Sequence, residues 1–353
     1  MLGTAGPGSR RYWCGSYTEQ GGEGIYLLER AGGDGPLHVV GLAAPATSPS
    51  FLALHPSKPV LYAVLEGDVG QVEAFAVRAG GELASIGRAP SLGSQPCHLS
   101  VLPASGAVAA ANYGSGEIVV IPTDQSGGFS ARAPRSLAGH GRGPDTQHQD
   151  GPHAHVVAPA PDGHILAADL GADLVRIFTE DPSLPELRPV AEMNLPAGGG
   201  PRHMAFGPYP FVYVLLELTS SVAVLRAEGT YSRLSLLDEV PAFVEPVPAG
   251  TWAAEITYQQ RHGMLYVSLR GADRICSLRA DDGGQRLKVV AETPSGGRWP
   301  RHFLIDGQMM YVANQYSNEV TCLGIRDADG ALFPTGQAAE VPAPACLLPV
   351  PAS

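Results

Sequence analysis

Short apolar strands separated by turns repeat along almost the whole chain. Six times, a proline or a small residue opens an apolar strand of about five residues. The openings are PSFLAL at Pro49, PCHLSV at Pro96, PHAHVV at Pro152, PRHMAF at Pro201, AAEITY at Ala253 and PRHFLI at Pro300. Each opening precedes a turn, a second strand such as VLYAVLE or FVYVLLEL, and a third strand such as QVEAFAV or SVAVLRA. No stretch keeps a helical period, so the pattern predicts an all-β protein.

The spacing of these repeats predicts a ring of blades. Starting at Pro49, successive openings are separated by 47, 56, 49, 52 and 47 residues. A period near 50 residues with several short strands per repeat is typical of a β-propeller. RYWCGSYT and GIYLLER near the N-terminus match second and third strands, and PACLLPV near the C-terminus matches an opening strand. We therefore expect a seven-bladed β-propeller in which the N- and C-terminal strands close one blade.

One domain accounts for the chain better than two, because no shift in composition marks a linker. We expect a flexible N-terminus over residues 1–10 and a single propeller domain over residues 11–353. The longest insertion, from Asp124 to Gly151, is expected to be a glycine-rich loop between two repeats. It directly precedes the PHAH segment, which would allow it to cover the mouth of the ring.

Polar residues recur at two points of the repeat that a hairpin brings to the same edge. The start of the first strand and the end of the second strand lie at that edge. Side chains from all seven blades should therefore gather at one end of the central channel, which we call the mouth. The strand openings contribute Ser50, His98, His153, His155, Arg202, His203, Glu255, Arg301 and His302. The ends of the second strands contribute Ser16, Glu66, Asn112, Asp169, Glu217, Arg270 and Asn314.

Composition narrows the choice of partner. The chain has 34 Asp and Glu against 23 Lys and Arg, a formal charge of −11, which argues against nucleic acid or an anionic membrane. Five widely spaced cysteines without a C-x-x-C pair favour a reducing compartment. No secretory signal and no apolar run of membrane-spanning length are present, so we expect a cytoplasmic protein.

Several interpretations of the polar ring remain open at this point. Polar groups around a propeller axis often bond only to strand ends and water, and Arg with Glu can form a purely structural network. His153 and His155 alternate along a strand and are expected to face the same side, but spacing fixes no third metal ligand. Oxygen donors on different blades would suit calcium, namely Glu66, Asn112, Asp169 and Asn314. Our prediction is a site without a metal or other cofactor.

Several segments together resemble the seven-bladed lactonase family. They are CGSYT, GPHAH followed by DLGAD, GGPRHMAF with LLELTSSV, SLRGADRI, and WPRHFLI with VANQYSNEV. The resemblance extends from about Tyr12 to the final strand, whereas the signatures of WD40 and kelch propellers are missing. Members of the family include bacterial 6-phosphogluconolactonases, and fungal carboxy-muconate lactonizing enzymes are relatives.

The resemblance implies cofactor-free chemistry on a cyclic ester. The family's His, Arg, Glu and Arg site positions fall on His153, Arg202, Glu217 and Arg270, which we take as the catalytic residues. Either His153 or Glu217 would be the general base, tuned toward neutrality by a partly dry mouth. The predicted substrate-binding residues are His155, His203, Arg301, His302, Asn112, Asp169 and Asn314.

The resemblance has one departure, and it leaves the substrate open. Many members carry Arg-Gln shortly before PHAH, where this chain has His148-Gln149. The first hypothesis is a hydrolase of a sugar lactone such as 6-phosphogluconolactone in the pentose phosphate route. The alternatives are a cycloisomerase or a lactonase for an unphosphorylated acid, and a non-catalytic propeller that binds a ligand or a protein. We expect a monomer or a weak homo-oligomer.

Overall fold

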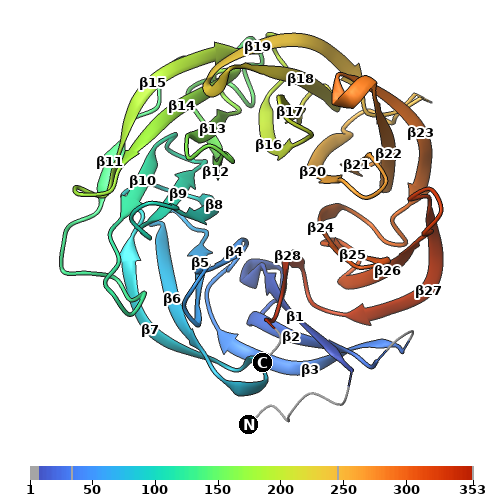
Figure 1. Cartoon of the computed structure of the whole chain (residues 1–353). Coiled ribbons are helices and arrows are strands. Elements are labelled where there is room, and N and C mark those ends of the chain that lie inside the picture. The colour runs from blue at the N-terminus through green and yellow to red at the C-terminus, as the bar shows by residue number, and fades with distance from the viewer. Residues whose placement is uncertain (1–7, 33–34, 245, 352–353) are drawn as a thin grey trace.

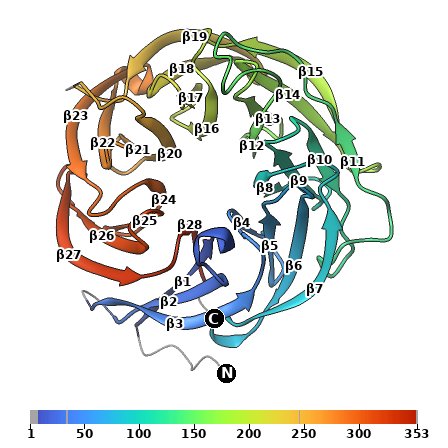
Figure 2. The same ribbon diagram turned by 180° about the vertical axis from the view of Figure 1, so that it is seen from behind.

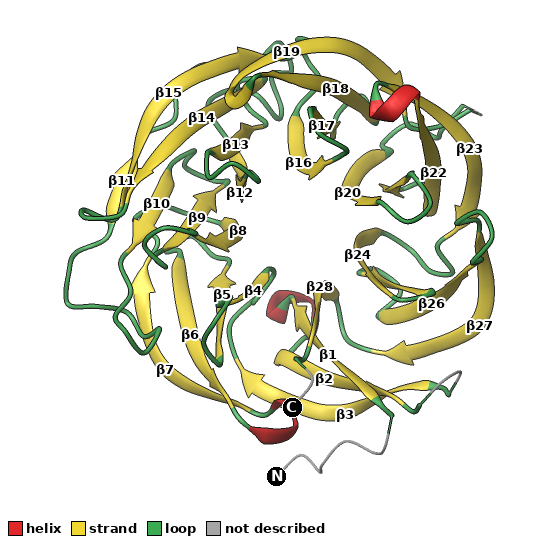
Figure 3. Ribbon diagram, viewed as in Figure 1, coloured by secondary structure: helices red, strands yellow, loops and turns green. Residues whose placement is uncertain are grey.

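Seven sheets, each of four antiparallel strands, form a ring around a central channel (Figure 1). This computed structural model describes residues 8–32, 35–244 and 246–351. Within these residues, helix is confined to three short 3₁₀ turns, η1 (Thr18–Gln20), η2 (Ala79–Gly81) and η3 (Asp282–Gly284), and strands and loops make up the rest (Figure 3). The structure confirms the predicted all-β, seven-bladed propeller.

Within each blade, four strands succeed one another from the channel to the outer rim. Blades 1 and 2 contain β28 (Pro344–Pro349), β1 (Arg10–Ser16), β2 (Gly24–Arg30) and β3 (Leu37–Pro45), then β4 (Leu52–Leu54), β5 (Val60–Leu65), β6 (Gln71–Val77) and β7 (Leu83–Pro90). Blades 3 and 4 contain β8 (Pro96–Val101), β9 (Val108–Asn112), β10 (Ile118–Ile121) and β11 (Arg135–Leu137), then β12 (Ala154–Pro159), β13 (Ile165–Asp169), β14 (Leu174–Asp181) and β15 (Glu186–Asn194). Blades 5 and 6 contain β16 (Pro201–Phe206), β17 (Phe211–Leu216), β18 (Ser221–Glu228) and β19 (Thr230–Pro241), then β20 (Trp252–Gln259), β21 (Met264–Arg270), β22 (Arg274–Asp281) and β23 (Arg286–Pro294). Blade 7 contains β24 (Pro300–Asp306), β25 (Met309–Asn314), β26 (Glu319–Ile325) and β27 (Leu332–Glu340).

The two ends of the described chain share blade 1. The C-terminal strand β28 pairs antiparallel with β1, with Trp13 opposite Leu348 and Cys14 opposite Leu347. Both faces of the ring show the two ends side by side at this blade (Figures 1 and 2). The predicted closure of one blade by terminal strands is confirmed, and it removes the open edge that a linear array of sheets would leave.

The core lies between neighbouring sheets, and a repeated hydrogen bond links the blades. Apolar side chains from the facing sheets of blades 5 and 6, for example, pack in one buried cluster. The buried Tyr213 of blade 5 donates its hydroxyl to the carbonyl of Gly284 in blade 6, at 2.6 Å. Tyr62 and Tyr266 make the same bond to Gly127 and Gly330 of the next blade. An aromatic ring thus fills each of these interfaces while its polar end stays satisfied.

Bulges distort the innermost strands where they enter the mouth. The pairing between the first and second strands shifts register at the start of β8, β12, β16, β20 and β24, and near the start of β28. The shifts fall on or beside His155, Arg202, His203, Glu255 and Arg301. A bulge adds an unpaired residue and redirects its side chain, so it turns these polar residues toward the channel at the cost of a regular ladder.

One expected segment has a different structure from the one predicted, and another lies only partly within the described residues. The insertion from Asp124 to Gly151 is more than a loop, because it contains β11, which pairs with β10 as the outer strand of blade 3. Residues 1–7 of the predicted flexible N-terminus lie outside the described residues, and β1 begins at Arg10. Within residues 8–32, 35–244 and 246–351, we find no helix with the length and apolarity needed to cross a membrane.

Candidate active site

One register position of each blade lines the same end of the channel. In blade 5, the backbone N–H of Glu217, just after the second strand, donates to the carbonyl of Gly200, just before the first strand, at 2.7 Å. The equivalent bond joins Tyr113 to Gln95 in blade 3, and strand pairing places Arg270 opposite Trp252 in blade 6. The seven equivalent residues are Tyr17, Glu66, Tyr113, Leu170, Glu217, Arg270 and Gln315.

Three predicted substrate-binding residues lie one position too early in this register. Asn112 donates to the carbonyl of Ser91, and Asn314 donates to Thr321 Oγ1. Asp169 accepts a 2.6 Å bond from Arg176. A shift of one residue turns a strand side chain to the opposite face. Asn112, Asp169 and Asn314 are fully buried in bonds to neighbouring strands and loops, so we leave all three out of the site that we propose.

The centre of the mouth is a bridge of two arginines on one carboxylate. Arg202 Nη1 lies 2.6 Å from Glu217 Oε2, and Arg270 Nη2 lies 2.7 Å from Glu217 Oε1. All three side chains are buried. Burial acts to raise the pKa of Glu217, but the charges of Arg270 and Arg202 outweigh it and lower the pKa to about 2. Glu217 is therefore a permanent carboxylate, opposite to the expected shift toward neutrality.

Aromatic rings that the sequence pattern did not predict surround Arg270. Its guanidinium lies 5.9 Å from the ring centre of Trp252 and 5.5 Å from that of Trp299. Burial lowers the pKa of Arg270 to about 10, so it remains charged near neutral pH. Trp299 is held at a φ of 66°, a left-handed conformation that costs energy for a residue with a Cβ. Both tryptophans directly precede a strand opening, at Ala253 and Pro300, and this position was the available signal.

His153 and His155 both contact the ring of one tyrosine, Tyr113. The ring of Tyr113 stacks on His153 at 4.7 Å between centroids and meets His155 edge-on at 5.7 Å. His153 Nδ1 is 2.7 Å from the carbonyl of Tyr113, and His155 Nε2 is 2.7 Å from Arg202 Nη1. His153 precedes β12 and His155 lies in its bulge, so the expected regular alternation of these two residues is wrong.

Because a guanidinium only donates, His155 Nε2 must accept the bond from Arg202 and the ring is neutral. Burial, reinforced by the charge of Arg202, holds the pKa of His155 well below its ordinary value. His155 is a fixed acceptor that orients Arg202 from behind, and it is unsuited to carry a proton at neutral pH.

A second, deeper polar cluster is built on Glu255. Its Oε2 lies 3.1 Å from His203 Nδ1 and 3.5 Å from His302 Nε2. Burial acts to raise the pKa of Glu255, but contacts with His203 and His302 lower it to about 2. His98 packs against Phe51 and His203, and burial holds its pKa well below the ordinary value. These residues form a layer beneath the arginine bridge, connected to it through His155, whose ring lies 5.3 Å from that of His203.

Arg301 occupies another side of the mouth. Its guanidinium lies 5.0 Å from the ring centre of Tyr17, whose hydroxyl donates to Glu66 Oε2 at 2.9 Å. No ion pair joins Arg301 to a carboxylate of the described residues, and although burial acts to lower its pKa, the nearby Tyr17, Glu66 and Glu217 outweigh burial and raise it. This arginine, partly exposed and without a directly bonded carboxylate among the described residues, is suited to bind a negatively charged group of a ligand.

The segment before PHAH links blade 4 to blade 6. Gln149 anchors it by donating to the carbonyl of Leu170 and to Asp173. The His148 ring then reaches blade 6, where it meets Trp252 edge-on at 5.4 Å. The residue that departs from the Arg-Gln pattern therefore contacts the aromatic wall beside Arg270.

The described residues contain no group of three or more His, Cys, Asp or Glu side chains arranged to hold a metal ion.

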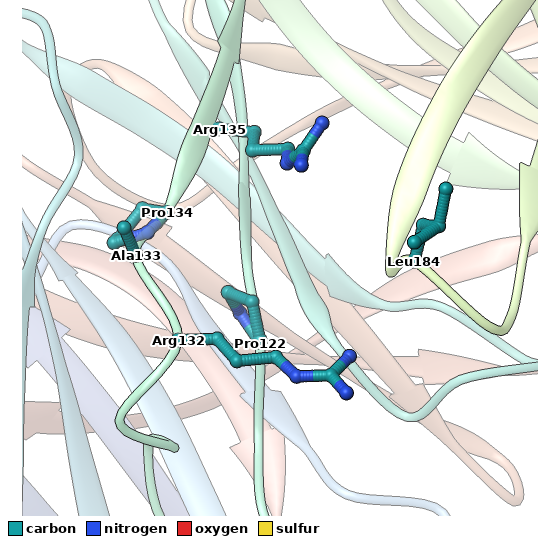
Figure 4. Close-up of a pocket in the computed structure, with 6 residues that line it drawn as sticks. All are labelled: Pro122, Arg132, Ala133, Pro134, Arg135 and Leu184. Carbon is teal, nitrogen blue, oxygen red and sulfur yellow. The ribbon is translucent and has the colours of Figure 1, made fainter.

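A surface hollow lies on the outer part of the ring between blades 3 and 4 (Figure 4). It measures about 340 Å³ and is lined by Pro122, Arg132, Ala133, Pro134, Arg135 and Leu184. None of the predicted catalytic or substrate-binding residues lines it.

Known proteins are similar over nearly the whole chain. A 6-phosphogluconolactonase of Bacillus subtilis is 29% identical over 342 residues, which are 95% of this chain and 97% of that protein. The crystal structure of a putative 6-phosphogluconolactonase from Bacteroides fragilis superposes with a TM-score of 0.89 at 27% identity, covering 98% of each chain. A periplasmic gluconolactonase of Pseudomonas aeruginosa gives 0.89 at 27% identity, covering 98% of this chain and all of that one.

The family assignment covers the complete ring. Residues 11–349 match the family described as lactonase, 7-bladed beta-propeller, and this range extends from β1 to the end of β28. The chain therefore belongs to the seven-bladed β-propeller lactonase family.

Proposed function

We propose that this protein hydrolyses a sugar lactone, with 6-phosphogluconolactone as the first candidate, by attack of water and without a metal. The observation that carries the proposal is the Arg202–Glu217–Arg270 bridge at the mouth, beside the pair of His153 and Tyr113. The relatives named as 6-phosphogluconolactonases support the reaction class.

The roles of the bridge follow from its charges. Attack of water on a lactone carbonyl places negative charge on the carbonyl oxygen, and preorganised guanidinium donors stabilise that charge. Arg202 and Arg270 have N–H groups beyond those used on Glu217, because each guanidinium carries five donors. Glu217, fixed as a carboxylate, aligns both arginines and is too weak a base to deprotonate water near neutral pH.

His153 is the better general base of the two candidates. The carbonyl of Tyr113 accepts a hydrogen bond from Nδ1, which leaves Nε2 to take a proton from water. The carboxylate of Asp150 lies 3.3 Å from Nε2 and would stabilise the protonated ring. The attacking water can therefore give its proton to His153 Nε2, and the Asp150 carboxylate balances the resulting charge.

The substrate is tested by following the decay of freshly made 6-phosphogluconolactone and of gluconolactone, each with and without protein. We expect faster loss of the phosphorylated lactone in the presence of protein, because Arg301 offers an unpaired cation. His153→Gln should lower the rate by at least about 100-fold, the usual contribution of a general base. Arg142→Gln, an exposed change in the loop before PHAH, is the matched control.

A second candidate is an unphosphorylated lactone. Two observations favour it, namely His148 in the place of the family's arginine and the similarity to a gluconolactonase. Preferential turnover of gluconolactone would establish it in place of the first candidate. Acceleration of neither lactone, with a ligand that still raises the melting temperature, would instead indicate a binding protein.

We also propose a cytoplasmic location. All five cysteines are free and buried, as suits a reducing compartment. The periplasmic relative is the reason to test this by cell fractionation.

A further inference from the structure

Tyr113 occupies the same register position in blade 3 that Glu217 occupies in blade 5. Each follows a second strand directly, and each donates its backbone N–H to the residue before the innermost strand. Fold position alone therefore directs the Tyr113 side chain to the end of the channel that holds the arginine bridge.

The Tyr113 ring contacts both histidines at the mouth. His153 stacks on it at 4.7 Å, and His155 meets it edge-on at 5.7 Å. The same residue orients His153, because its carbonyl accepts the bond from Nδ1. Tyr113 thus connects the proposed base to the residue that supports Arg202.

The Tyr113 hydroxyl differs from those of the tyrosines between the blades. Tyr62, Tyr213 and Tyr266 each donate to a glycine carbonyl at 2.6 Å. The Tyr113 hydroxyl has no hydrogen-bond partner among the residues that the structure describes, and it does not belong to the fully buried polar atoms. A tyrosine with a fixed ring and an uncommitted hydroxyl at a mouth is available to a ligand.

The surrounding charges keep this hydroxyl protonated. Burial raises the pKa of Tyr113 to about 12, and the nearby Glu217 acts in the same direction against Arg202 and Arg270. The group is a hydrogen-bond donor throughout the neutral range.

We propose that Tyr113 is a further catalytic residue of the lactone hydrolysis, whose hydroxyl donates to the ring oxygen of the lactone and protonates it as it leaves. This inference rests on the proposed function. It supplies the acid that the arginine bridge lacks, because guanidinium groups do not give up protons near neutral pH.

The proton balance of the step is complete. His153 Nε2 takes one proton from water as the water oxygen bonds to the carbonyl carbon, and the carbonyl electron pair moves onto its oxygen. When the tetrahedral intermediate collapses, the bond from carbon to the ring oxygen breaks, and that oxygen takes the Tyr113 proton. The protonated His153 then returns its proton to the phenolate, and the product is the open hydroxy acid.

The test is Tyr113→Phe, which removes only the hydroxyl and keeps the ring and the carbonyl that His153 uses. We expect kcat to fall by about 30- to 300-fold, as for loss of a general acid, while KM stays within about threefold. The melting temperature should equal that of the wild type, because the hydroxyl has no partner in the described part of the protein. Tyr209→Phe, an exposed tyrosine in the turn between β16 and β17, is the matched control and should retain full activity.

Three results would overturn the proposal. An unchanged kcat would show that the hydroxyl takes no part in the chemistry, and a raised KM with unchanged kcat would make it a binding contact. A markedly lower melting temperature would show a structural partner for the hydroxyl. The proposed function fails separately, if the wild-type protein itself accelerates the decay of no lactone.

Discussion

Two buried carboxylates in one channel, Glu217 and Glu255, reach the same low pKa by different means. Glu217 is held by two arginines and Glu255 by two histidines, and both have a pKa of about 2. Arginine keeps its charge at neutral and acidic pH, whereas an imidazole changes its charge near neutrality. The layer at the mouth is therefore built for constant charge, whereas the carboxylate of Glu255 relies on imidazoles, whose charge changes with pH.

We expect the largest effect on stability and activity when the carboxylate at the mouth, Glu217, is replaced. Glu217→Gln leaves Arg202 and Arg270 buried without a counter-charge, so we expect unfolding to become easier by about 3 kcal/mol. Loss of alignment of both arginines should lower kcat by at least about 100-fold. Chemical denaturation and lactone decay measure the two effects.

Glu186→Gln is the control for that change, because Glu186 pairs with Arg135 and Arg188 on an exposed outer strand. Exposed pairs contribute little, so stability should change by less than about 1 kcal/mol and activity not at all. Equal effects of the two variants would contradict the assigned role of Glu217.

Glu255→Gln sharpens the comparison in the deeper layer. An amide oxygen can still accept a hydrogen bond from His203, so the variant keeps part of the polar contacts of Glu255. We expect a loss of about 1–3 kcal/mol in the free energy of unfolding and less than about a tenfold change in kcat. A fall in kcat as large as that for Glu217→Gln would mean that the deeper layer takes part in the chemistry.

Acid should separate the buried histidines from the buried carboxylates by their pH ranges. The pKa values of His98 and His155 are lowered in the native state, so below about pH 6.5 the unfolded chain binds protons that the native rings exclude. Stability is therefore complete above that pH and falls as the pH drops, by about 1.4 kcal/mol per pH unit for each ring.

The lowered carboxylate pKa values act in a second range. Glu217 and Glu255 contribute stability above about pH 4.5 that is lost as the pH falls toward 2. Urea unfolding between pH 8 and pH 3 should show both ranges, and His98→Gln should reduce the slope of the upper one only. A flat profile between pH 6.5 and pH 5 in the wild type would contradict the lowered pKa values of His98 and His155.

The smallest effect is expected outside the channel, where Tyr213→Phe removes one link between blades 5 and 6. Loss of this buried hydrogen bond should cost about 1 kcal/mol, somewhat more if the Gly284 carbonyl stays unpaired. Lactone turnover should not change. A loss of activity would show that the interfaces between blades control the geometry of the mouth.

The sequence predicted the ring well because strand periodicity and spacing are properties of each repeat. The openings at Pro96, Pro201 and Pro300 are the first residues of β8, β16 and β24, as the pattern predicted. Arg202, Glu217 and Arg270 were also brought together as the resemblance implied.

The finer register could not be obtained from the same pattern. Asn112 and Tyr113 are adjacent, and the uniformly buried run of β9 (VAAAN) has no polar alternation that would show which of them faces the channel. The contact of His148 with Trp252 joins residues 104 positions apart through an irregular loop, for which no periodicity exists. Apolar patterns determine which face is buried, whereas bulges and loops determine where polar groups meet.

The pairing of β28 with β1 has a consequence for synthesis on the ribosome. Blade 1 combines the first strand of the ring to be translated with the last, so it cannot be completed until Pro344–Pro349 has left the exit tunnel. Until then, the nascent chain presents the unpaired edge of β1, the kind of surface that aggregates and that chaperones bind. A premature stop after β27 would leave six intact blades and an unprotected edge, and quality control should remove such a product.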